Sequence, residues 1–139
     1  MRIVLDTNVF VFAAIQNGAS HQIVQHLIRD NSDELFICDE ILSELRDVLV
    51  SRPRLRKWIS IDDAELYVEM IQLRFNFVPN PTEIIPISRG SDDDYILALA
   101  KRETADYVVS GDKDLLVLQI PELSIVTPAE FVTILKRTS

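Results

Sequence analysis

The sequence predicts an α/β fold in which helices cover both faces of a parallel β-sheet. Short, almost continuous apolar runs recur along the chain, as expected for strands that are buried on both faces. Longer segments with apolar residues at helical spacing lie between these runs. Because strands and helices alternate from one end to the other, a parallel sheet is favoured over an antiparallel one.

The first half of the chain begins with a strand, and strands then alternate with helices. The predicted elements are, in order, a strand over residues 2–5, helices over 9–15 and 20–30, a strand over 35–38, and a helix over 39–49. Gly18 separates the first two helices, and Ser20 is placed to cap the second. Pro53 ends the third helix region.

The second half continues the alternation after a proline-rich interruption. The predicted elements are, in order, helices over residues 60–75 and 92–103, strands over 106–109 and 123–126, and a final helix. Asp62 and Glu65 are placed for a capping box at the first of these helices, and Thr127 and Glu130 for one at the last. Residues 76–87 contain three prolines and therefore form only short or edge strands.

Composition indicates one soluble domain over residues 1–139. No apolar run approaches the roughly 20 residues of a membrane-spanning helix, and the N-terminus does not read as a secretory signal, so we expect a cytoplasmic protein. The lone Cys38 is expected to be a buried small hydrophobe. The formal net charge of −8 argues against broad affinity for nucleic acid, but acids gathered at one metal site would contribute to that excess.

Four acidic residues are expected at one edge of the sheet. Asp6 directly follows the first strand, and Asp112 follows the strand over 106–109 after two residues. Asp93 opens the helix that leads into that strand, and Glu44 lies at the margin of an apolar helical stripe, from which it can lean towards the sheet. Because ligands of parallel sheets bind at the carboxyl ends of the strands, we expect these carboxylates to converge there.

Converging carboxylates require a cation, because they otherwise raise each other's pKa. Oxygen ligands without histidine pairs or cysteines suit Mg²⁺ or Mn²⁺, which points to a metal-activated water that attacks phosphorus. Taken singly, each acid has an ordinary explanation. Asp6 could cap the first helix, and residues 92–94 could form the first turn of a helix that Ser91 caps. Glu44 could be an ordinary surface residue, and Asp112 and Asp114 could belong to a plain turn.

The segments "VLDTNVF", "EILSELRDVL", "DDDYILALAKRETADYVVSGDKDLL" and "IVTPAEF" together resemble a PIN (PilT N-terminus) domain. They are most similar to the bacterial and archaeal group of VapC-like ribonuclease toxins, and the resemblance covers essentially the whole chain. It implies that Asp6, Glu44, Asp93 and Asp112 are the catalytic, metal-binding acids. Asp94 is the reserve choice for the third acid, because three aspartates compete for that position.

The resemblance also implies supporting residues and a function. Asn8 would support the first acid, Ser110 takes the place of the commoner Thr before the last one, and Asp114 would be an outer ligand or position a water. The implied protein has a sheet in the order 3-2-1-4-5. It cleaves single-stranded RNA with Mg²⁺ or Mn²⁺, forms a homodimer, and is inhibited by a small antitoxin protein.

Two other functions stay open on the sequence alone. A haloacid-dehalogenase-like phosphatase also has an aspartate after its first strand, but it needs a general acid where this chain has Asn8. Leu116 also occupies the place of that family's later acid. A catalytically weak interaction module with the same fold and metal site is not separated from a nuclease, because a complete acid set does not prove activity.

A basic segment follows the predicted third helix. Arg52, Arg54, Arg56 and Lys57 lie beside Trp58 in "SRPRLRKW". The cations could hold an RNA backbone while the indole stacks on a base. The alternative is a solvated turn with Trp58 partly buried as packing.

Overall fold

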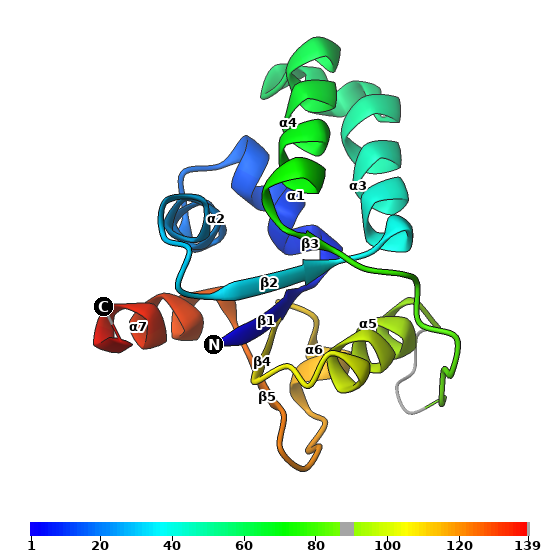
Figure 1. Cartoon of the computed structure of the whole chain (residues 1–139). Coiled ribbons are helices and arrows are strands. Elements are labelled where there is room, and N and C mark those ends of the chain that lie inside the picture. Colours follow the sequence, from blue (N-terminus) through cyan, green and yellow to red (C-terminus); the bar gives the residue numbers. More distant parts are fainter. Residues whose placement is uncertain (87–90, 139) are drawn as a thin grey trace.

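The fold is built on a five-stranded parallel sheet in the order β3-β2-β1-β4-β5 (Figure 1). The structure is a computed structural model that describes residues 1–86 and 91–138, without the side chains of 91, 92 and 138. The strands are β1 (Arg2–Leu5), β2 (Glu34–Ile37), β3 (Asn76–Phe77), β4 (Tyr107–Val109) and β5 (Ser124–Val126). The predicted fold class and strand order are confirmed.

The central strands position the residues that follow them. Ile3, Val4 and Leu5 of β1 have no exposed surface, as expected for apolar strands covered on both faces. Leu5 is the register partner of Val109 in β4, and the Asp6 N–H donates to the Val109 carbonyl at 3.0 Å. The chain therefore leaves β1 and β4 side by side at the same edge of the sheet.

Helices lie on both sides of this sheet. They are α1 (Thr7–Ile15), α2 (Ala19–Arg29), α3 (Asp39–Ser51), α4 (Ile61–Arg74), α5 (Ser91–Arg102), α6 (Lys113–Leu116), α7 (Pro128–Thr138) and the short 3₁₀ helix η1 (Pro53–Lys57). Figure 1 shows α5 and α6 on one side of β1 and β4, and α2 and α7 on the other. Helices α3 and α4 lie side by side and extend away from the sheet.

Two predicted helix caps are wrong, and one is confirmed. Helix α2 begins one residue before Ser20, so that Gly18 is its N-cap and Ser20 is buried within the first turn. Helix α4 is capped by Ser60, which accepts a hydrogen bond from the Asp63 N–H at 3.1 Å. The helix therefore starts before Asp62 can act as a cap. At α7 the capping box of Thr127 and Glu130 is present, with reciprocal hydrogen bonds of 3.1 and 3.2 Å.

Other predictions also hold within the described residues. Cys38 is fully buried, and the proline-rich segment contributes only the two-residue edge strand β3; residue 87 lies outside the described part. The predicted cap Ser91 falls among the side chains that are not described. Across residues 1–86 and 91–138, no helix combines the length and apolar character needed to cross a bilayer.

Arg74 ties the end of α4 to the end of α2. Its guanidinium donates to the carbonyls of Leu27 and Ile28 at 2.9 and 3.0 Å. The last carbonyls of a helix have no partner within the helix, so these hydrogen bonds satisfy groups that would otherwise need water.

Candidate metal centre

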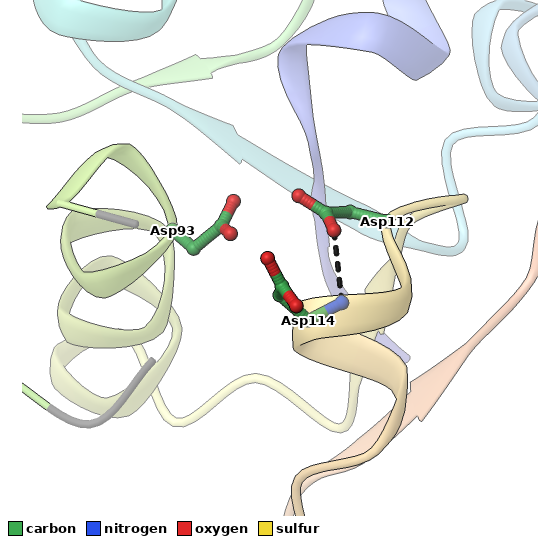
Figure 2. A group of neighbouring side chains, drawn as sticks. All are labelled: Asp93, Asp112 and Asp114. Carbon is green, nitrogen blue, oxygen red and sulfur yellow. Dashed lines mark hydrogen bonds between the residues drawn. The ribbon is translucent and has the colours of Figure 1, made fainter. Parts of the chain in front are cut away.

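Three aspartate side chains meet where β4 ends and α5 begins. Asp93, Asp112 and Asp114 each offer a carboxylate oxygen, and these oxygens all lie within 4.8 Å of one another. Figure 2 shows Asp93 on α5 facing Asp112, which is the N-cap of α6, and Asp114 in the first turn of α6. Asp93 is buried, whereas the other two side chains are half-buried, so the cluster is open to solvent on one side.

The turn that carries Asp112 and Asp114 is fixed by side-chain hydrogen bonds. Asp112 is the N-cap of α6, and its Oδ1 accepts from the Asp114 N–H at 2.9 Å (Figure 2). The Asp112 N–H in turn donates to the hydroxyl oxygen of Ser110 at 2.9 Å. This arrangement folds the chain back so that the two carboxylates lie on the same side.

Ser110 also connects this turn to Asp6. The fully buried Ser110 hydroxyl donates to Asp6 Oδ2 at 2.8 Å. Asp6 stands at the N-cap position of α1, but its side chain makes no capping hydrogen bond. The first predicted acid is therefore bonded to a residue after β4, and hydrogen bonding from the backbone of Thr7 and Asn8 also lowers its pKa.

The carboxylates of the site affect one another's protonation. Burial, followed by the charges of Asp112, Asp6 and Asp114, raises the pKa of Asp93 from 3.8 to about 7. Burial also raises the pKa of Asp6; the hydrogen bond from Ser110 opposes this effect, and the charge of Asp112 adds to it. Asp6 thus belongs to the same electrostatic group as the three clustered aspartates, and a cation among them would relieve the repulsion.

Glu44 approaches from α3 but is not among the three clustered carboxylates. It is half-buried, and its Oε2 accepts from the hydroxyl of the buried Thr7 at 3.2 Å. Burial raises the pKa of Tyr95 on α5, and the charge of Glu44 raises it further. Glu44 therefore faces α1 and α5 near the positions of Asp6 and Asp93. Asp47, one turn further along α3, is exposed.

Asp94 and Asn8 lie apart from the cluster. Asp94 is buried, but it lines a cavity of about 560 Å³ together with Leu97 and Thr104. Asn8 is exposed, and the part of the chain that is described shows no side-chain hydrogen bond from it to Asp6. Among the described residues, Asp93 joins the cluster and Ser110 holds the first acid.

The donor atoms suit a hard divalent cation. The cluster consists of carboxylate oxygens, contributed by aspartates alone. Mg²⁺ and Mn²⁺ prefer such ligands and keep several waters when only a few carboxylates bind them. The half-buried setting of Asp112 and Asp114 leaves access for water and for a phosphate group.

Two contributors were underestimated by the sequence analysis. Asp114, expected only as an outer group, lies within the cluster; its spacing of two from Asp112, typical of a side-chain-capped turn, was the available signal. Thr7 was not among the candidate site residues, yet its hydroxyl donates a hydrogen bond to Glu44. Its position next to Asp6 was the only hint in the sequence.

A family model and a curated relative each match most of this chain. The family model described as PIN domain matches residues 2–114, which include every candidate acid. The uncharacterized protein MJ1680 of Methanocaldococcus jannaschii is 28% identical over 142 residues, and the match covers 95% of this chain and 90% of that protein.

A solved structure shares the fold. It is the crystal structure of VapBC2 from Rickettsia felis bound to a DNA fragment from their promoter. The TM-score is 0.64 at 16% sequence identity, and the match covers 91% of this chain and 98% of the other. At this identity the likeness concerns the arrangement of helices and strands.

Proposed function

The chain belongs to the PIN domain family, and from this membership we propose that it is a divalent-metal-dependent endoribonuclease that cleaves single-stranded RNA. The observation that carries the proposal is the meeting of Asp93, Asp112 and Asp114 beside Asp6 at the carboxyl edge of the sheet. A cation among these carboxylates would offset their mutual repulsion and let Asp93 ionise at neutral pH, and a solvent-accessible carboxylate site suits phosphodiester hydrolysis.

The residues of the site have separate tasks in this proposal. Bound Mg²⁺ or Mn²⁺ supplies an activated water and neutralises charge at the phosphate. Asp93 and Asp112 of the cluster would hold the cation together with the neighbouring Asp6, and Glu44, which accepts a hydrogen bond from Thr7, would complete the acid set from α3. The Ser110 hydroxyl fixes Asp6 and Asp112 relative to each other, because it donates to the Asp6 carboxylate and accepts from the Asp112 N–H. Asp114 accepts a hydrogen bond from water at the open side of the cluster.

We further propose that the protein is the toxin of a cytoplasmic toxin–antitoxin pair. It would act as a homodimer, and a small antitoxin protein would keep it inactive. The support is the fold shared with the VapBC2 structure.

Cleavage of single-stranded RNA by the purified protein tests the enzymatic proposal. A panel of RNAs is incubated with Mn²⁺, Mg²⁺ or EDTA beside the variants Asp6→Asn and Asp112→Asn. We expect metal-dependent cleavage that falls by more than about 100-fold in both variants, because each removes a carboxylate from the cation. Asp47→Asn makes the same chemical change at an exposed position of α3 and is expected to cleave normally.

The same assay separates the alternatives. Undiminished cleavage by Asp6→Asn would identify a contaminating nuclease and remove the mechanism. An inert wild-type protein over many RNAs would favour an interaction module. Phosphate release from small phosphomonoesters without RNA cleavage would favour a phosphatase.

A further inference from the structure

We propose that residues 52–58, here called the basic turn, form a second binding site for single-stranded RNA, away from the metal centre. The inference rests on the proposed function, since the strand bound there would be the substrate. The turn combines positive charge that is unpaired among the described residues, attachment to the core, a position within reach of the metal centre and an exposed tryptophan.

The basic turn gathers positive charge that the protein does not neutralise. Four of the 14 Lys and Arg residues lie between Arg52 and Lys57, in a chain whose net charge is −8. Arg52, Arg54 and Lys57 are exposed, and no ion pair involves them within residues 1–86 and 91–138. By contrast, Arg46 pairs with Glu65 at 2.9 Å. Three cations are therefore available to phosphates.

The fourth cation attaches the turn to the end of α3. Arg56 is directed inward, where its guanidinium donates to the Leu49 carbonyl, and two of its nitrogens are buried without a hydrogen-bond partner among the described residues. Leu55 is buried as well, and the Trp58 N–H donates to the Leu55 carbonyl at 3.0 Å. The backbone that presents the exposed cations is thus anchored to the core, which reduces the entropy lost when a ligand binds.

Trp58 is a large aromatic side chain that the protein leaves in solvent. The residue is 56% exposed, so more than half of its surface is open to a ligand, and the Lys57 ammonium lies 6.0 Å from the ring centroid. Cations that follow a backbone beside an aromatic face on which bases stack are the recurring composition of sites for single-stranded nucleic acid. An acidic protein segment would be recognised by the exposed cations alone, whereas the bases of RNA would also stack on the indole. The exposed indole therefore favours RNA as the ligand.

The turn lies within reach of a strand held at the metal centre. Helix α3 starts just after β2 at the carboxyl edge of the sheet and leads away to the basic turn, with Glu44 in its first half (Figure 1). Its 13 residues span roughly 20 Å at 1.5 Å per residue. At about 3.4 Å per stacked nucleotide, roughly six nucleotides would bridge the two sites.

The fluorescence of Trp58 provides a direct test, because it is the only tryptophan in the chain. Wild-type protein in EDTA is titrated with a single-stranded RNA of twelve nucleotides and with one of four. We expect saturable quenching by the longer RNA, with log affinity falling against log salt at a slope near −2 for three contacts. Unchanged emission at saturating RNA, as measured with labelled RNA, would overturn the inference.

Variants test the residues separately, with anisotropy of labelled RNA as the readout. Trp58→Ala is expected to weaken binding of the longer RNA by about 5- to 150-fold, which corresponds to the loss of one stacked base. The combined Arg52→Ala, Arg54→Ala and Lys57→Ala variant should flatten the salt dependence. Arg137→Ala, an exposed cation on α7, is the matched control. Unchanged affinity in both variants of the turn would contradict the proposal.

The outcome does not depend on catalysis, because binding is measured without metal. RNA binding through Trp58 in a protein that never cleaves RNA would refute the nuclease proposal and leave this site intact. RNA cleavage with the same KM in wild type and Trp58→Ala would refute this site and leave the nuclease intact. Quenching by poly-glutamate but not by RNA would overturn it in favour of an acidic protein partner.

Discussion

Replacing Asp93 by asparagine should stabilise the metal-free protein although it removes a metal ligand. The folded-state pKa of about 7 exceeds the ordinary value of 3.8 by about 3 units, which corresponds to at most about 4 kcal/mol against the ionised form. Asp112 and Asp114 are half-buried, so we halve this figure for solvent screening. Loss of the favourable helix-dipole interaction subtracts up to about 1 kcal/mol. A net gain of about 1–2 kcal/mol remains.

Thermal unfolding in EDTA measures this gain. With an unfolding entropy of about 2.1 cal/mol/K per residue, the 139-residue chain should gain about 3–7 °C in Tm at pH 8. Because folding raises the pKa of Asp93, the wild-type free energy of unfolding falls as pH rises from about 4 to about 7. The Asp93→Asn variant has no carboxyl group at this position, so its free energy of unfolding lacks this decrease. At pH 4 the advantage should vanish.

The control for this prediction is another aspartate. Asp47→Asn on the exposed side of α3 should change the free energy of unfolding by less than about 0.5 kcal/mol at either pH. If Asp93→Asn were less stable than wild type at pH 8 in EDTA, the repulsion inferred for the site would be wrong.

Three further predictions concern the cation, its scaffold and the helix contacts. Mn²⁺ should raise the wild-type Tm more at pH 8 than at pH 6, because Asp93 must release its proton to bind the ion. The Tm of Asp93→Asn should change little on addition of Mn²⁺. Equal Tm shifts at both pH values in scanning fluorimetry would count against Asp93 as a metal ligand. Ser110→Ala should lower the free energy of unfolding in urea by about 1.5–3 kcal/mol and the rate of RNA cleavage by at least about 10-fold. Ser110→Thr retains a hydroxyl that can donate to Asp6 and is the control. Equal cleavage rates in the two variants would exclude the proposed role of Ser110. Arg74→Ala should lower the free energy of unfolding by about 1.5–3 kcal/mol in the same assay without changing the affinity for Mn²⁺. A changed Mn²⁺ affinity would show that the contact between α2 and α4 is coupled to the metal centre.

The elements of the fold could be predicted because their signals are local. The run 2–5 is apolar at every position after Arg2, and the structure buries it on both faces. Strand order is different, since no local pattern says that β1 lies between β2 and β4; only the family resemblance supplied it. The misplaced cap at Ser20 has a local cause, because glycine and serine compete for the same helix start within two residues.

The candidate site could be predicted to the extent that it depends on strand ends. Asp6 leaves the sheet in register with Ser110, so a reading of strand termini was sufficient to bring it near Asp112. The place of Asp114 depends on how the turn folds back on the Asp112 side chain, and the approach of Glu44 depends on the packing of α3. Neither follows from periodicity, since both are set by tertiary contacts.

Diffraction from crystals grown with Mn²⁺, recorded at the manganese absorption edge, would show whether these carboxylates share a cation. We expect an anomalous peak within coordination distance of Asp93 and Asp112, with Asp6 on the same ion or beside it, and loss of that peak in Asp112→Asn. Carboxylates at these positions without a peak, or manganese bound elsewhere on the chain, would contradict a shared cation at this site.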